Sequence, residues 1–93
     1  MTKELSILIP VYNSAACLSQ TVEKVISTIS SLNVSYEIIL IDDASIDASW
    51  KVIKELKQKY DCITGVRFNK NFGQHNALLC GIKSANANYI VTI

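Results

Sequence analysis

The chain has 93 residues, of which 49% are hydrophobic and 18% charged, and its formal net charge is +1. A chain of this length forms one domain at most, and the composition is too apolar for a disordered segment. The near-neutral charge gives no electrostatic reason to expect a nucleic acid partner.

The apolar runs are all far shorter than the roughly 20 residues that span a bilayer, and no signal peptide precedes the first predicted strand. The three cysteines are widely spaced, with no CxxC pair to suggest zinc or redox chemistry. Each stands among apolar residues, so we expect reduced core cysteines in a cytoplasmic protein.

The first predicted elements are a strand and an amphipathic helix. Leu5–Val11 is β-branched and nearly continuous in apolar residues, as in a strand buried on both faces. Asn13 or Ser14 offers an N-cap, and apolar residues between positions 18 and 32 then recur on one helical face.

The second and third strands frame another helix. Tyr36–Ile41 reads as a buried strand and is followed by an acidic loop, Asp42–Asp47. Asp47 can cap a helix whose apolar side covers positions 50–60. Ile63–Phe68 is interrupted by glycine and arginine, which favours a strand nearer the edge of a sheet.

The last predicted elements follow a polar turn over Asn69–Gly73. A third helix contains Leu78, Leu79 and Ile82, and a fourth strand covers Tyr89–Ile93. The order β-α-β-α-β-α-β predicts an α/β fold, a three-layer Rossmann-like parallel sheet with right-handed crossovers. In such sheets ligands bind outside the carboxyl ends of the strands.

Polar side chains follow the first three predicted strands at this edge. Tyr12 could stack on a base, and Asp42 and Asp43 could accept hydrogen bonds from a base or a ribose. Gly73 would let backbone approach a ligand, and the third helix starts nearby with free N–H groups. Each feature also has a purely structural interpretation, as rim packing, a solvated turn or a helix cap. The argument for a binding site therefore depends on their common position at one edge of the sheet.

Other classes of protein fit less well. A dinucleotide-dependent oxidoreductase or a phosphate-loop nucleotidase needs a glycine-rich turn after the first strand, which this sequence lacks. A non-catalytic module remains as an alternative, either receiver-like, with the two aspartates as an acidic pocket, or a nucleotide-binding interaction domain. The end of the third strand, Phe68-Asn69, argues against a receiver-like domain, which would want an aspartate there.

Three segments, SILIPVYN, YEIILIDDASID and NKNFGQHNALLCGI, resemble in order and spacing the glycosyltransferases of family 2, whose catalytic domain has the GT-A fold. The third segment is most similar to the dolichyl-phosphate mannose synthase-like branch, which transfers sugars to polyprenyl phosphates. The resemblance implies that residues 1–93 are a partial domain, the N-terminal nucleotide-binding half of a GT-A domain.

The resemblance also implies roles for individual residues. Pro10 and Tyr12 would line the base pocket, with Tyr12 against the base. Asp43 would hydrogen-bond the base, with Ile41 and Asp42 beside it. The residues expected near the ribose and diphosphate are Asn71, Gly73 and Gln74.

The sequence departs from the family pattern at several positions. Ser14 stands where the polyprenyl-phosphate branch often has glutamate, Ala44 where glycine is usual and Ile46 where threonine or proline is usual. We expect the latter two to change the backbone of this loop without removing the site.

The resemblance implies a parent enzyme that transfers a sugar from a UDP- or GDP-sugar, with inversion, to an acceptor such as a polyprenyl phosphate or a glycan. Mg²⁺ or Mn²⁺ would be held by an Asp-x-Asp type motif expected after the fourth strand, so its ligands lie outside this chain. We therefore expect this chain by itself to be inactive and to self-associate through uncovered apolar surface. Membrane contact would come only from other segments, at the cytoplasmic face.

Overall fold

The computed structural model describes residues 3–93, which form seven strands and helices in the predicted order. Their bounds are β1 (Lys3–Val11), α1 (Leu18–Ser30), β2 (Tyr36–Asp42), α2 (Ser49–Lys59), β3 (Ile63–Arg67), α3 (Gln74–Ser84) and β4 (Ala87–Thr92). The alternation expected from the sequence is therefore confirmed.

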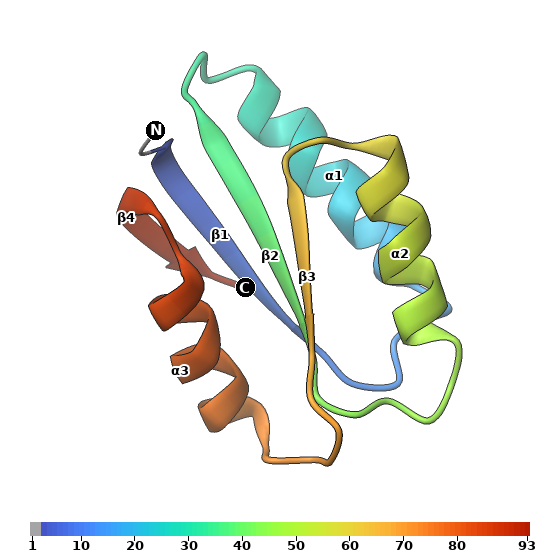
Figure 1. The fold of residues 1–93 in the computed structure, drawn as a ribbon. Helices are drawn as coiled ribbons and strands as arrows, with labels where there is room; N and C mark the ends of the chain where they lie inside the picture. Colours follow the sequence, from blue (N-terminus) through green and yellow to red (C-terminus); the bar gives the residue numbers. More distant parts are fainter. Residues whose placement is uncertain (1–2) are drawn as a thin grey trace.

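The strands form one parallel sheet in the order β3-β2-β1-β4. Helices α1 and α2 cover one face of this sheet and α3 covers the other, which gives three layers (Figure 1). β3 is an edge strand, as its glycine and arginine indicated, and β4 forms the opposite edge. The fold class is the predicted three-layer Rossmann-like α/β arrangement.

Each face of the sheet has its own apolar core. Alternate residues of β1, such as Ile7 and Ile9, pack toward α1 and α2, whereas Leu8 packs toward α3 with Ile39 and Ile41. These central strands are buried on both faces, which explains their nearly continuous apolar sequence.

The first helix begins later than predicted. Asn13 and Ser14 do not cap α1, because the N–H groups of Cys17 and Leu18 both donate to the Ser14 carbonyl in a turn that precedes the helix. Cys17 lies exposed in this turn, so the expectation that all three cysteines are core residues is wrong.

The start of α2 is stabilised by Asp47, the residue that the sequence offered as its cap, although not from the N-cap position. The N-cap position of α2 is Ala48, but the Asp47 carboxylate accepts the N–H of Ser49, the first residue of the helix, at 2.9 Å. Asp47 therefore stabilises the start of α2 from one residue further out than a regular cap.

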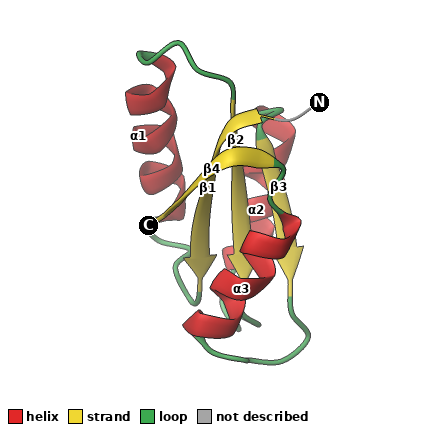
Figure 2. Ribbon diagram, turned by 90° about the vertical axis from the view of Figure 1, so that its left-hand side faces the viewer, coloured by secondary structure: helices red, strands yellow, loops and turns green. Residues whose placement is uncertain are grey.

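The carboxyl ends of β1, β2 and β3 point to the same edge of the sheet, where the loops that follow them gather (Figure 2). Helices lie on opposite faces on the two sides of β1, so the crossover direction reverses between β1 and β4. Ligands of open α/β sheets bind at such a reversal.

Candidate functional site

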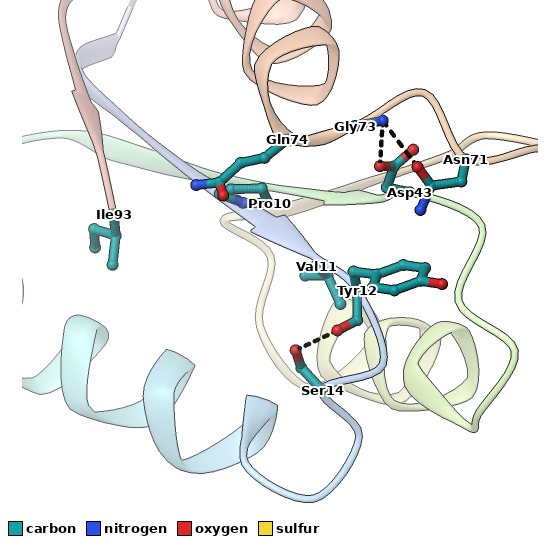
Figure 3. A pocket seen from close by; sticks show the side chains of 9 residues that line it. All are labelled: Pro10, Val11, Tyr12, Ser14, Asp43, Asn71, Gly73, Gln74 and Ile93. Carbon is teal, nitrogen blue, oxygen red and sulfur yellow. Dashed lines mark hydrogen bonds between the residues drawn. The ribbon is translucent and has the colours of Figure 1, made fainter.

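A pocket of about 370 Å³ opens at this reversal (Figure 3). It is lined by the end of β1 and the turn after it, by the residues that follow β2 and β4, and by the loop that leads into α3 with the first residue of that helix. The lining residues are Pro10, Val11, Tyr12, Ser14, Asp43, Asn71, Gly73, Gln74 and Ile93.

Tyr12 presents an aromatic ring to the pocket directly after β1. Its side chain is half exposed, at 51%, so the ring has a free face. The Ser14 hydroxyl donates to the Tyr12 carbonyl at 3.1 Å, which ties the backbone of this turn together. Pro10, the penultimate residue of β1, also lines the pocket.

Asp43 is the buried acid of the site, with 3% exposure. Its Oδ1 accepts the N–H of Phe72 at 2.7 Å, and its Oδ2 accepts the N–H of Gly73 at 2.8 Å. One carboxylate thus holds the β3–α3 loop against the end of β2. Each oxygen keeps further lone-pair capacity for a donor that enters the pocket.

The loop before α3 supplies amides and open backbone. Asn71 Oδ1 accepts the N–H of Gly73 at 3.0 Å. Gly73 has φ of +91°, a conformation that favours glycine, and a Cβ there would have no heavy atom within 4 Å, so the backbone borders open space. Gln74 begins α3, whose first N–H groups have no partner within the helix.

Two of the predicted site residues do not line this pocket. Ile41 has 0% exposure and packs under α3, where its Cδ1 would lie 2.9 Å from a Cβ at Gly81. Asp42 is also fully buried, and its Oδ1 accepts the N–H of Ser45 at 3.0 Å. The expectation that both lie beside the base contact stays a prediction, although Ile41, which packs toward α3, is too buried to line the pocket itself.

Asp42 instead belongs to a partly buried ion pair. Its Oδ2 has no hydrogen-bond partner among residues 3–93, and the Nε of Arg67 lies 3.9 Å away. The Arg67 guanidinium also lies 5.5 Å from the centre of the Trp50 ring. Asp42 therefore faces β3 through Arg67, which in turn lies over the Trp50 ring of α2.

Sequence reasoning did not assign Val11, Ser14 or Ile93 to the site. Ile93 follows the last strand, and the rule that ligands bind at carboxyl ends of strands would have found it. Val11 ends β1 just before the predicted Tyr12, and Ser14 lies in the turn that follows it, where the direction of a side chain could not be read from spacing.

The loop that follows Asp42 and Asp43 has a backbone conformation at position 44 that suits glycine, the residue usual there in the family. Ala44 has φ of +59°, in the left-handed region, despite its Cβ. Ile46 is 89% exposed, and its N–H donates to Asn13 Oδ1 at 2.9 Å.

Asp47 joins this loop to the one that carries Tyr12. Its Oδ2 accepts the N–H of Ala15 at 3.2 Å, and its Oδ1 accepts the Ser49 hydroxyl at 2.6 Å. The Ser49 hydrogen bond is the main reason that the pKa of the Asp47 carboxyl lies below its ordinary value.

Within residues 3–93 there is no group of three or more His, Cys, Asp and Glu side chains that could hold a metal ion. His75 is exposed on the first turn of α3. In the same part of the chain, none of the helices has the length and apolar character to cross a membrane.

The pocket combines an exposed ring, a buried carboxylate and a helix start, which suit the flat apolar face, the N–H groups and the anionic groups of a ligand, respectively. Together with the parallel sheet, these features define a Rossmann-like α/β protein with its site at the carboxyl edge. The sequence model of Glycosyl transferase family 2 matches residues 6–93, and the chain belongs to this family.

Curated relatives and solved structures agree with this assignment. The undecaprenyl-phosphate 4-deoxy-4-formamido-L-arabinose transferase of Proteus mirabilis (strain HI4320) is 35% identical over 97% of this chain, which spans only 28% of that protein. The chain thus belongs to a family of enzymes, and the receiver-like alternative is not supported.

Two solved proteins share the fold. TarS of S. aureus (residues 1–349) superposes with a TM-score of 0.77 at 16% identity, covering 97% of this chain and 26% of TarS, and its complex with UDP gives 0.73 at the same identity and coverage. The mannosyltransferase PcManGT from Pyrobaculum calidifontis, in complex with GDP-Man and Mn²⁺, has a TM-score of 0.69 at 19% identity, covering 91% of this chain and 25% of that protein.

Proposed function

We propose that the pocket binds the nucleotide of a UDP- or GDP-sugar donor, and that residues 1–93 are the nucleotide-binding part of a GT-A glycosyltransferase domain. The observation that carries this proposal is the meeting of Tyr12, Asp43 and the 71–74 loop at one pocket. The complexes of the structural neighbours with UDP and with GDP-Man support a nucleotide-sugar as the ligand class.

Tyr12 and Asp43 are the base contacts in this proposal. The free face of the Tyr12 ring would stack on the base, a contact that contributes about 1–3 kcal/mol in comparable sites. Asp43 would accept an N–H of the base in the plane of the ring. Its carboxylate is held in a fixed direction by Phe72 and Gly73, so little ordering remains to be done on binding.

The 71–74 loop is the proposed contact for the ribose and diphosphate. Asn71 uses its Oδ1 on Gly73 and keeps its amide nitrogen as a donor for a ligand oxygen. Gly73 permits a close approach of the ligand to the backbone, and the start of α3 at Gln74 favours negative charge.

For the whole enzyme we propose transfer of the sugar, with inversion, to an acceptor such as a polyprenyl phosphate or a glycan. The name of the Proteus mirabilis relative, an undecaprenyl-phosphate transferase, supports a lipid phosphate as the acceptor. We propose that the whole enzyme works at the cytoplasmic face of the membrane. Mg²⁺ or Mn²⁺, held by residues outside this chain, is proposed from the Mn²⁺ complex of the mannosyltransferase.

We also propose that the chain self-associates through β4, an edge strand whose Tyr89, Ile90 and Val91 are 73%, 41% and 44% exposed. Sedimentation velocity at increasing concentration tests this, and a single monomeric species at all concentrations would contradict it.

Calorimetric titration with UDP and with GDP tests the nucleotide site. Tyr12→Ala should weaken binding of the preferred nucleotide about tenfold or more because the stacking face is lost. Tyr89→Ala, which removes an exposed ring from β4, is the matched control and should leave the affinity unchanged. Equal affinities for the wild type and Tyr12→Ala would refute the assignment of Tyr12 to the base.

A further inference from the structure

The loop that carries Tyr12 is held by the side chains of the loop after β2. The backbone N–H groups of three successive residues, Asn13, Ser14 and Ala15, all donate to side-chain oxygens of that loop or of Ser49, the first residue of α2. In the same order, the acceptors are Ser45 Oγ at 2.9 Å, Ser49 Oγ at 2.8 Å and Asp47 Oδ2 at 3.2 Å.

Asp47 controls two of these three contacts. Its Oδ2 accepts the Ala15 N–H directly, while its Oδ1 accepts the Ser49 hydroxyl proton at 2.6 Å. A hydroxyl has one proton, so donation to Asp47 turns a lone pair of Ser49 Oγ toward the Ser14 N–H.

These hydrogen bonds, which we call the Asp47 relay, continue from Asp47 and Ser49 to the pocket. Ser14 lines the pocket, and its own hydroxyl donates to the carbonyl of Tyr12. A continuous series of hydrogen bonds therefore runs from Asp47 through Ser49 and Ser14 to the backbone of Tyr12. Asp47 itself is exposed and is not among the residues that line the pocket.

We propose that Asp47 is a positioning residue for nucleotide binding: it sets the direction of the Tyr12 ring through Ser49, Ser14 and Ala15 without contact with the ligand. This inference rests on the proposed nucleotide site. A helix cap alone would need only the bond from Asp47 to the N–H of Ser49, whereas the bond to Ala15 joins a loop 32 residues away in sequence.

The experiment compares the wild-type 93-residue chain with Asp47→Ala, Asp47→Asn and Asp61→Asn. Asp61 is an exposed aspartate in the turn before β3, outside the pocket, so Asp61→Asn makes the same charge change without touching the relay. Two quantities are measured: the affinity for UDP and GDP, and amide hydrogen exchange at Ser14 and Ala15 relative to the buried strand amides of β1 and β2.

Asp47→Ala should speed exchange at Ser14 and Ala15 selectively and weaken binding of the preferred nucleotide about tenfold, as expected for loss of a hydrogen bond to a charged group. Asp47→Asn keeps one acceptor oxygen and should show a smaller loss of affinity. Asp61→Asn should match the wild type. If Asp47→Ala does not fold, the smaller loss of nucleotide affinity in Asp47→Asn still tests the proposal.

Unchanged affinity in a folded Asp47→Ala variant would overturn the positioning role, as would exchange that accelerates equally in β1 and β2. If the wild type binds neither UDP nor GDP, the proposed function itself fails, and the amide signals of Tyr12 and Ser14 then decide the inference. Shifted signals with selective exchange in Asp47→Ala would support the positioning of Tyr12, and unaltered ones would refute it.

Discussion

Asp43 is the residue that links the fold to the site. Its two oxygens hold the N–H groups of Phe72 and Gly73, so the carboxylate that we assign to the base also fixes the loop assigned to the ribose and diphosphate. A charged acceptor that is 3% exposed and bonded on both oxygens has a fixed direction. The two halves of the pocket are therefore coupled through one side chain.

Asp43→Asn should therefore damage stability and binding together. The carboxamide offers one oxygen and an NH₂ group, so one of the two backbone N–H groups faces another donor and loses its hydrogen bond to residue 43. We expect the free energy of unfolding, measured by urea denaturation, to fall by about 1–3 kcal/mol. Nucleotide affinity should fall in the same variant.

The matched control for this change is Asp61→Asn, on an exposed aspartate in the turn before β3. It should leave both quantities as they are in the wild type. A stable Asp43→Asn variant with full nucleotide affinity would show that neither oxygen has the role described.

At the residue scale the sequence predicted most of the residues that meet at the pocket, but not the direction of every side chain. Pro10, Tyr12, Asp43 and the 71–74 loop meet at the pocket because each follows or ends a parallel strand. Ile41 and Asp42 do not, because the alternation within β2 turns Ile41 toward α3 and leaves Asp42 under its own loop. The family resemblance placed Ile41 and Asp42 at the site because they precede Asp43 in sequence. Successive residues of a strand, however, point their side chains to opposite faces of the sheet.

At the scale of elements, α2 packs tightly against β3 at Gly65. A Cβ there would lie 2.8 Å from Cγ2 of Ile53 and 3.4 Å from Cζ3 of Trp50. Ile53 is fully buried, and its Cγ2 is bonded directly to Cβ, so it cannot turn away without a change of rotamer. The glycine that weakened the sequence pattern of this strand is what lets the helix pack on it.

Gly65→Ala should therefore lower the free energy of unfolding by about 1–3 kcal/mol, the usual cost of overpacking a core. Chemical denaturation measures this, and Lys54→Ala, on the exposed side of α2, is the control that should change stability little. Equal or greater stability in Gly65→Ala would mean that α2 has more freedom than the structure shows.

The start of α1 shows why element boundaries were harder to predict than elements. The apolar spacing of the helix was correct from Leu18 to Ile29, whereas Leu32 lies beyond the end of α1 and is exposed. Asn13 and Ser14 had side chains suited to an N-cap. These two residues instead bond to the loop after β2, through Ser45, Ser49 and Ile46. A contact between loops more than 30 residues apart leaves no local signal in the sequence.

At the scale of the whole molecule, the order of strands and helices was sufficient to predict the three-layer parallel sheet. The position of the pocket follows from the reversal of crossover direction between β1 and β4, which brings Val11 and Ile93 to the same rim. The exposed outer side of β4 did not follow from its sequence, because Tyr89–Ile93 is as apolar as a buried strand.

The central claim, that this pocket binds a nucleotide, is tested most directly by amide NMR shifts during titration of the 93-residue chain with UDP and with GDP. We predict shifts centred on Tyr12, Asp43 and Gly73, stronger for one nucleotide and nearly the same with and without Mn²⁺. Shifts confined to other surfaces, such as α1 or β4, or no shift with either nucleotide, would contradict the account.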